Sequence, residues 1–159
     1  MKKSSIIAIF LIYLTSIILV GFFGFKMKAD NPIIYANKIV WNSSEFENKT
    51  GFTIVKDKEV LEEKGFLVDA SLNYKTYDLA GGMTINIKCN CEPLEATNPK
   101  LEYSLDTQST KIELNVLSDN TANLTFKASI GANLTVRTTD GSNIKYIIKI
   151  DVINISEFI

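Results

Sequence analysis

The sequence predicts an all-β domain, an antiparallel β-sandwich, preceded by one N-terminal transmembrane helix. Two observations lead to this prediction: an unbroken apolar stretch near the amino terminus, and short segments further along in which apolar and polar residues alternate. Alternation with a period of two places one face of a strand in a core and the other in water. Several such strands, separated by turn residues and with no long helical period among them, are typical of a sandwich.

Residues 1–28 have the pattern of a membrane-inserted helix. Lys2-Lys3 precedes an apolar run over 4–25, which ends at Lys26-Met27-Lys28. At ~1.5 Å per residue, a helix over this run reaches the ~30 Å of hydrocarbon in a bilayer. The pattern therefore predicts a single-pass signal anchor in the cell membrane.

A cleaved signal peptide is the alternative interpretation of this segment. Its apolar region is usually shorter and ends in a small-x-small site. Such a site is missing at Gly21-Phe22-Phe23-Gly24-Phe25, and Ala29 and Ala36 are poor cleavage points, so we expect the segment to stay attached. The flanking lysines are nearly balanced, but a basic start followed by an apolar run resembles an export signal. We therefore expect the amino terminus inside and the C-terminal domain extracytoplasmic.

Residues 29–159 are expected to form a single domain, because about 130 residues are enough to bury one core. Four of the 17 basic residues lie at the anchor, which leaves 13 basic against 18 acidic side chains and a net charge of −5 for this part. A domain with this charge has no electrostatic case for binding nucleic acid.

Residues 83–153 are predicted to supply the core strands. The segment 83–91 alternates apolar and polar residues at every position, and five further segments do the same: 101–105, 112–116, 124–126, 134–136 and 144–152. Between the last two, Asp140-Gly141 tolerates the positive φ that tight hairpin turns require. We therefore predict a hairpin at this point.

Residues 30–82 are predicted to hold the first strand and an elaboration. We expect three strands and a loop there: strands over 33–41, 52–55 and 66–74, and a loop over 42–51. The charged segment 56–64 either makes a short helical turn closed by Gly65 or forms a hairpin loop. Ala80-Gly81-Gly82 marks the turn into the strand that starts at Met83.

A series of short motifs follows in a fixed order. An apolar-x-Pro step, an Ala-Thr-Asn turn and an aromatic-Ser pair are present as Cys91-Glu92-Pro93, Ala96-Thr97-Asn98 and Tyr103-Ser104. They precede Leu124-Thr125-Phe126, Leu134-Thr135-Val136 and Thr138-Thr139-Asp140-Gly141-Ser142. With these motifs, residues 74–153 resemble the bacterial immunoglobulin-like domains of surface adhesins of the intimin and invasin type. The resemblance implies an immunoglobulin-like sandwich whose matching residues are scaffold, and a role in presentation or binding.

The side chains available for chemistry argue against an enzyme. The chain has no histidine, which removes the commonest general base and the commonest zinc ligand. The two cysteines, Cys89 and Cys91, share a strand face with Ile85 and Ile87, so we expect two buried thiols and neither a disulfide nor a zinc site. We predict no catalytic, cofactor-binding or metal-binding residue.

Polar and aromatic clusters have plain structural interpretations. Three carboxylate pairs in loop-like stretches are expected to be surface charge: Glu45-Glu47, Glu62-Glu63 and Glu92-Glu95. Two further segments contain oxygens suited to calcium but lack the spaced carboxylates of a calcium loop, so turn chemistry explains them better: Asp119-Asn120 and Asp140-Gly141-Ser142-Asn143. The aromatic residues Trp41, Phe46 and Phe52 either form an exposed patch or pack in the core, which is the more frequent role.

Together these features predict a membrane-anchored, extracytoplasmic immunoglobulin-like domain that acts as a non-catalytic binding or structural module at the bacterial cell envelope. Its partners would be the membrane and a protein or carbohydrate ligand. One alternative is an accessory subunit that docks on a larger membrane complex through its anchor or an exposed strand edge. Another is an envelope enzyme that uses carboxylates, which would need acidic residues clustered in one pocket.

Overall fold

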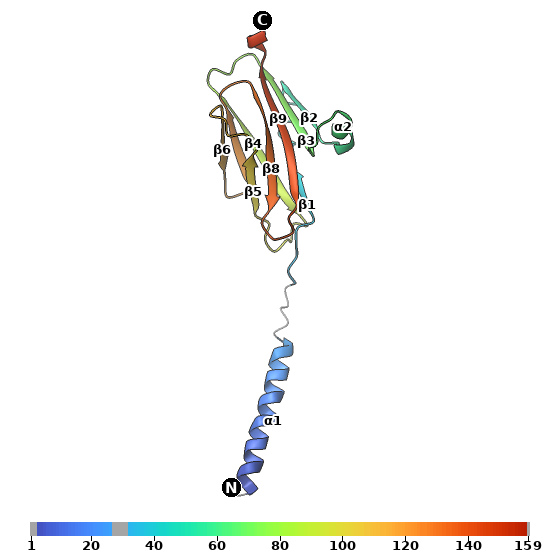
Figure 1. The fold of residues 1–159 in the computed structure, drawn as a ribbon, viewed down its shortest axis with the longest axis vertical. Coiled ribbons are helices and arrows are strands. Elements are labelled where there is room, and N and C mark those ends of the chain that lie inside the picture. Colours follow the sequence, from blue (N-terminus) through green and yellow to red (C-terminus); the bar gives the residue numbers. More distant parts are fainter. Residues whose placement is uncertain (1–2, 27–31, 159) are drawn as a thin grey trace. The chain divides into compact units, whose positions relative to one another are not determined.

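The computed structural model describes residues 3–26 and 32–158. The chain divides into two compact units, Met1–Ile33 and Ile34–Ile159, and each is described by itself. The first unit contains one helix and the second contains the strands (Figure 1).

The first unit holds α1, Lys3–Lys26, so the predicted helix is confirmed. The hydroxyl of Ser16 donates to the backbone oxygen of Ile12 at 2.8 Å, and the hydroxyl of Thr15 donates to the oxygens of Leu11 and Ile12 at 3.0 and 2.9 Å. These two polar side chains are satisfied by the helix itself, so they do not require water.

The structure contradicts the predicted membrane crossing. Within residues 3–26 and 32–158, no helix is both long enough and apolar enough to cross a membrane.

The second unit is a β-sandwich of two sheets. The first sheet has the strand order β1-β4-β7-β6, formed by β1 Lys38–Trp41, β4 Met83–Glu92, β7 Thr121–Phe126 and β6 Ile112–Val116. The second has the order β2-β3-β9-β8-β5, formed by β2 Phe52–Val55, β3 Ala70–Thr76, β9 Lys145–Asn154, β8 Ile130–Thr138 and β5 Leu101–Leu105. Two short helical elements complete it, α2 Lys58–Glu63 and a 3-10 turn over Ile155–Phe158. The predicted mainly-β sandwich is confirmed.

The strand alternation read from the sequence defines the core. On β4, Ile85, Ile87, Cys89 and Cys91 are buried and the residues between them are exposed. The facing sheet contributes fully buried side chains from β3, β8 and β9, among them Leu72, Leu134, Val136, Ile148 and Ile150. Because inward positions of both sheets are apolar, the two layers share one hydrophobic core.

The sandwich is mixed and not wholly antiparallel as predicted. β3 pairs with β9 in parallel, from Ala70 opposite Ile148 to Thr76 opposite Asn154. The other pairs, including β4 with β7 and β8 with β9, are antiparallel. The chain reaches β3 through β2 and α2, and then leads directly into β4 of the other sheet, which fixes the direction of β3. Alternation alone could not reveal this, because its period is the same for both directions.

Two predicted strands are shorter or shifted. The strand expected over 33–41 is confined to Lys38–Trp41, because Ile34 bonds to Thr97 and Ala36 bonds to Asp140 instead of to the neighbouring strand β4. The strand expected over 66–74 begins at Ala70, because Phe66 ends α2: its N–H bonds to the oxygen of Leu61 at 2.8 Å.

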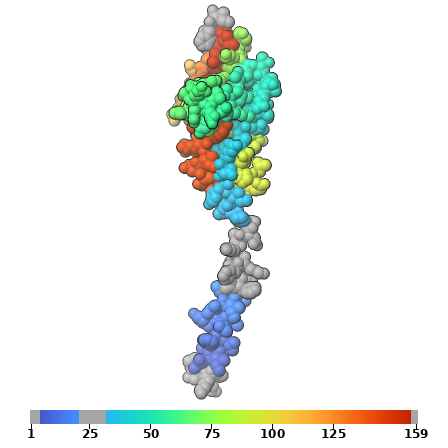
Figure 2. Space-filling view, turned by 90° about the vertical axis from the view of Figure 1, so that its right-hand side faces the viewer, coloured from blue at the N-terminus to red at the C-terminus, as the bar shows by residue number. Residues whose placement is uncertain are grey.

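The segment 56–64 forms a helix, so the hairpin-loop alternative is wrong. The Asp57 carboxylate caps α2 by accepting the N–H of Glu59 at 3.1 Å, and Gly65 ends it with a φ of +80°. Figure 2 shows this region, in green, standing out from the surface of the sandwich. Leu61 is 1% exposed, so the helix is attached by one apolar anchor.

Candidate functional site

Four segments meet at the end of the sandwich where the chain enters it, which we call the tether end (Figure 1). They are the first segment of the unit, 34–37, the loop 93–100, the β6–β7 turn 117–120 and the β8–β9 turn 139–144. Hydrogen bonds join these segments across both sheets.

The first segment is fixed to two distant parts of the chain. Ile34 donates its N–H to the Thr97 hydroxyl at 2.8 Å and accepts the Thr97 N–H at 2.9 Å. Ala36 donates its N–H to the Asp140 carboxylate at 2.6 Å. The chain is therefore held against the sandwich before β1 begins.

Asp140 organises the β8–β9 turn. Its carboxylate also accepts the Ser142 N–H at 2.9 Å and the Ser142 hydroxyl at 2.6 Å. These Ser142 bonds, together with the Ala36 N–H, lower the pKa of Asp140 to about 2. Gly141 has a φ of +91°, so the predicted hairpin and its turn chemistry are confirmed.

Asn120 links the two sheets at the tether end. Its side-chain oxygen accepts the Leu101 N–H at 2.9 Å, and its amide donates to the backbone oxygen of Pro99 at 2.8 Å. The Tyr103 hydroxyl donates to the backbone oxygen of Asn120. Asn120 lies in the left-handed region, with a φ of +59°, which asparagine tolerates better than most residues. The turn of the first sheet is thereby tied to β5 of the second.

Exposed apolar side chains gather at the same end. Seven large hydrophobic residues are exposed in the described part of the second unit, and five lie at the tether end: Ile34, Tyr35, Leu94, Val116 and Leu117. Their exposed fractions run from 36% for Ile34 to 77% for Leu94. The other two are Leu67, after α2, and Tyr77, after β3. Single exposed apolar residues are ordinary on proteins, but a gathering of them indicates a contact surface.

Two shallow hollows flank these side chains. One, of about 380 Å³, is lined by Asn37, Glu92, Pro93, Leu94 and Glu95. The other, of about 390 Å³, is lined by Lys100, Leu101, Glu102, Tyr103, Val116 and Thr139. The charged side chains of the first lining are both acidic, whereas those of the second are of both signs, and both linings also contain apolar side chains. Such mixed, open linings suit a wet interface more than a closed reaction site.

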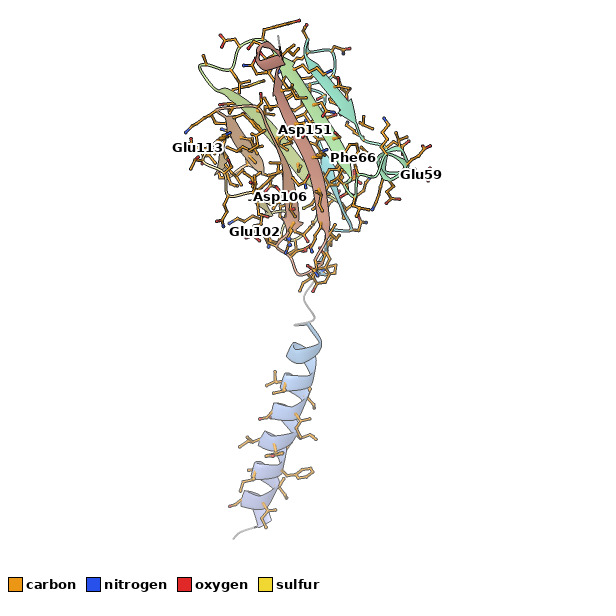
Figure 3. The ribbon with its side chains drawn as sticks, turned by 45° about the horizontal axis from the view of Figure 1, so that its top comes forward. Glu59, Phe66, Glu102, Asp106, Glu113 and Asp151 are labelled. Carbon is orange, nitrogen blue, oxygen red and sulfur yellow. The ribbon has the colours of Figure 1, made fainter. Side chains whose placement is uncertain are left out.

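The predicted carboxylate pairs lie at the surface. All six glutamates of these pairs are exposed, and they belong to the loop after β1, to α2, and to the end of β4 with the loop after it. Other acidic residues are also dispersed: Figure 3 shows Glu59, Glu102 and Glu113 on separate parts of the molecule. Among the residues whose placement is described, no three metal-ligating side chains come together.

The two thiols lie in the core, as predicted. Cys89 and Cys91 are unbonded to each other, and burial raises the pKa of Cys89 to about 12. Burial also raises the pKa of Cys91, whose thiol contacts the backbone oxygen of Pro99 at 3.5 Å. Both thiols are therefore protonated at neutral pH and act as small apolar side chains.

The aromatic residues form a row in the core, and the alternative of an exposed patch is wrong. Trp41 and Phe46 are only 3% and 5% exposed. Ring centroids are 6.0 Å apart for Trp41 and Phe46, 5.2 Å for Phe46 and Phe52, and 4.4 Å for Phe52 and Tyr74. The loop 42–51 uses this row to close the side of the sandwich.

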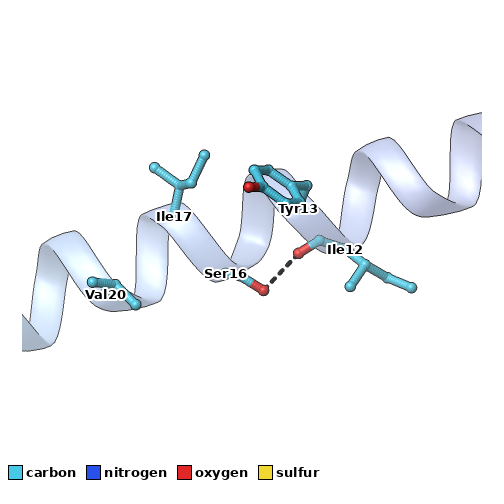
Figure 4. Close-up of a pocket in the computed structure, with 5 residues that line it drawn as sticks. All are labelled: Ile12, Tyr13, Ser16, Ile17 and Val20. Atoms are coloured by element: carbon cyan, nitrogen blue, oxygen red, sulfur yellow. Dashed lines mark hydrogen bonds between the residues drawn. The ribbon is translucent and has the colours of Figure 1, made fainter.

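Over residues 5–20, where its side chains are described, the surface of α1 is apolar on every side. Twelve large hydrophobic side chains between Ile6 and Val20 are 46–73% exposed. One face carries a shallow groove lined by Ile12, Tyr13, Ser16, Ile17 and Val20, with the small Ser16 between larger neighbours (Figure 4). A helix without a polar face is stable when it is buried in protein or in lipid.

The sequence did not reveal the braces or the apolar gathering at the tether end. Asn120 and Asp140 were predicted to serve their own turns, but their partners lie up to 104 positions away. Leu94 and Leu117 did give a signal, because each is an apolar residue in a turn outside the strand alternation.

Known protein-family models give no match to this chain, and no curated protein matches it in sequence. The fold and the surface define the class of protein: a β-sandwich whose tether end is held by hydrogen bonds and is partly apolar, together with the apolar helix α1.

Proposed function

We propose that this protein is an immunoglobulin-like module held at a membrane by α1, outside the cytoplasm, where it binds or supports other molecules of the cell envelope without catalysing a reaction. The proposal requires α1 to lie in lipid and does not require it to cross the bilayer.

The apolar surface of α1 is the single observation that carries the proposal. Its twelve exposed hydrophobic side chains leave no polar face that could rest in water. Its two central hydroxyl residues, Thr15 and Ser16, return their hydrogen bonds to the helix, so entry into lipid leaves them satisfied. Each apolar side chain moved from water to hydrocarbon gains about 1.5–3 kcal/mol when fully buried.

The strand order supports the immunoglobulin-like assignment. With β1, β4, β5, β6, β7, β8 and β9 taken as strands A to G, the first sheet reads A-B-E-D and the second contains G-F-C. This is the order of the constant-type immunoglobulin sandwich. β2, α2 and β3 are then an elaboration between A and B that extends the second sheet beyond G.

A binding or structural role fits the surface better than acid–base catalysis. The paired glutamates are exposed, and the hollows at the tether end are open and shallow. General acid–base catalysis needs carboxyl groups whose environments separate their pKa values, which usually means burial.

The test is fractionation of cells that express the full chain, followed by protease treatment of intact cells. We expect the chain to remain with membranes through an alkaline carbonate wash, since apolar burial does not depend on ionic contacts. Trypsin added outside is expected to release the sandwich by cleavage after Lys26 or Lys28.

Two outcomes would contradict the proposal in different ways. Recovery of the chain in the carbonate wash would show that α1 does not anchor the chain in lipid. Protection of a membrane-bound chain until the cells are lysed would place the sandwich on the cytoplasmic side.

A further inference from the structure

The exposed apolar side chains are distributed unevenly along the length of the sandwich. The exposed side chains of Tyr35, Leu94, Val116 and Leu117 belong to three segments far apart in sequence. Tyr35 and Leu94 lie at the end where the chain enters the sandwich, and Val116 and Leu117 lie at the β6–β7 turn, which Asn120 bonds to that end. At the opposite end, where β3 and β9 finish, Tyr77 is the exposed large hydrophobic residue among those described. The apolar surface is therefore polarised along the strands.

The covalent link bounds the distance from this end to α1. Eight Cα–Cα steps separate Lys26, the last residue of α1, from Ile34, which is bonded to the sandwich through Thr97. At no more than ~3.6 Å per step, the link spans at most about 29 Å. A lipid surface that holds α1 is consequently within reach of the tether end.

The short link makes even a weak contact effective. A surface tethered to a binding partner experiences it at an effective concentration set by the link, in the millimolar range for short links. A few half-exposed apolar side chains, too few to bind lipid alone, can then dock reversibly.

We infer that the tether end is a second lipid-contacting surface, in which Tyr35, Leu94 and Leu117 enter the interfacial layer of the membrane that holds α1. This inference rests on the proposed function, because it needs α1 to be in lipid. Tyr35 suits the interface, since its ring is apolar and its hydroxyl remains wet. The charges beside these residues are Glu92, Glu95, Glu102 and Lys100, which are mostly acidic, so the contact does not rely on anionic lipid.

The contact would orient the sandwich. With the tether end on the membrane, the strands point away from it and present the opposite end, with Tyr77 and the end of β9, to the surroundings. Asp140 bonds the first segment of the unit to the β8–β9 turn, and Asn120 bonds the β6–β7 turn to the start of β5.

The test uses the full chain in phosphatidylcholine vesicles, with an environment-sensitive fluorophore attached at L94C or, as a matched control, at Y77C. Cys89 and Cys91 are buried and protonated, so the new thiol is labelled selectively. We expect the label at position 94 to emit at shorter wavelength and to be quenched at least twofold more by a shallow nitroxide lipid than the label at position 77.

Each outcome decides between the two proposals. If the vesicles float without the protein, the proposed function fails. If the protein floats with them but the label at position 94 behaves like the one at 77, the anchor stands and the second contact is overturned. A blue shift at position 94 without quenching by the nitroxide lipid would mean that a second copy or another protein covers this end, which also overturns the inference.

Discussion

α1 and the sandwich contain the same kinds of apolar side chain in opposite surroundings. In the sandwich, Ile87, Leu124 and Phe126 are completely buried, whereas on α1 twelve large hydrophobic side chains are 46–73% exposed. At ~25 cal/mol per Å² of apolar surface, the surface left uncovered on α1 corresponds to on the order of 10 kcal/mol or more. The sandwich completes its own core, and α1 needs an apolar environment from outside the chain.

A variant that interrupts the apolar surface of α1 should have the greatest consequence. The double variant Leu11→Lys with Ile18→Lys introduces two charges at the centre of the helix, each costing about 2.5–3.5 kcal/mol in hydrocarbon. We expect this variant to move from the membrane fraction to the soluble fraction in vesicle flotation. Leu67→Lys, on an exposed site of the sandwich, is the control and should stay with the vesicles; equal behaviour of the two would show that α1 is not the anchor.

The core of the sandwich gives the next largest effect. Ile87→Ala is expected to lower the free energy of unfolding by about 2–5 kcal/mol, because Ile87 is fully buried between the sheets. Leu67→Ala, at a side chain that is 87% exposed, should change it by less than about 0.5 kcal/mol. Urea unfolding followed by the fluorescence of the buried Trp41 measures both, and a similar loss for the two variants would contradict the burial that separates them.

The brace at Asn120 is expected to contribute less than the core. Asn120→Ala removes the two side-chain bonds to Pro99 and Leu101, and we expect a loss of about 1–3 kcal/mol. Asn143→Ala is a matched control, because Asn143 has the same φ of +59° but is exposed in the β8–β9 turn. The difference between the two variants in free energy of unfolding measures the contribution of the Asn120 side-chain hydrogen bonds apart from backbone strain. Equal losses would show that these hydrogen bonds do not stabilise the fold.

The smallest expected effect is a pH dependence at Asp140. The pKa of Asp140 is lowered to about 2 in the folded protein, so the carboxylate stabilises the fold above its ordinary pKa near 4. This stabilisation is lost as the pH falls from about 4 through 2, where Asp140 becomes protonated. Urea midpoints measured across this range should fall more steeply for the wild type than for Asp140→Asn; parallel curves would contradict the assignment.

The strands of 83–153 could be predicted from the sequence because each follows a period of two. The burial pattern of β4, from Ile85 to Cys91, matches that period at every position. The region before Met83 was predicted less well, since Phe66 serves the end of α2, Ile34 bonds to Thr97 and Ala36 bonds to Asp140. The last two contacts join residues that are 63 and 104 positions apart, and local patterns contain no information about them.

The candidate surface was only partly accessible from sequence. The turn chemistry of Asp140 was predicted from Asp-Gly, but its bond to Ala36 and the gathering of Leu94 with Leu117 depend on the pairing of the sheets. The buried state of Cys89 and Cys91 followed directly from their place on an alternating strand.

A fluorophore at I12C, in the full chain reconstituted into phosphatidylcholine vesicles, tests whether the apolar surface of α1 lies in lipid. Ile12 is 66% exposed on α1. If α1 lies in lipid, we expect blue-shifted emission that is quenched by a nitroxide deep in the acyl chains and insensitive to iodide in the buffer. Emission as in water, with strong quenching by iodide and none by the lipid nitroxide, would contradict it.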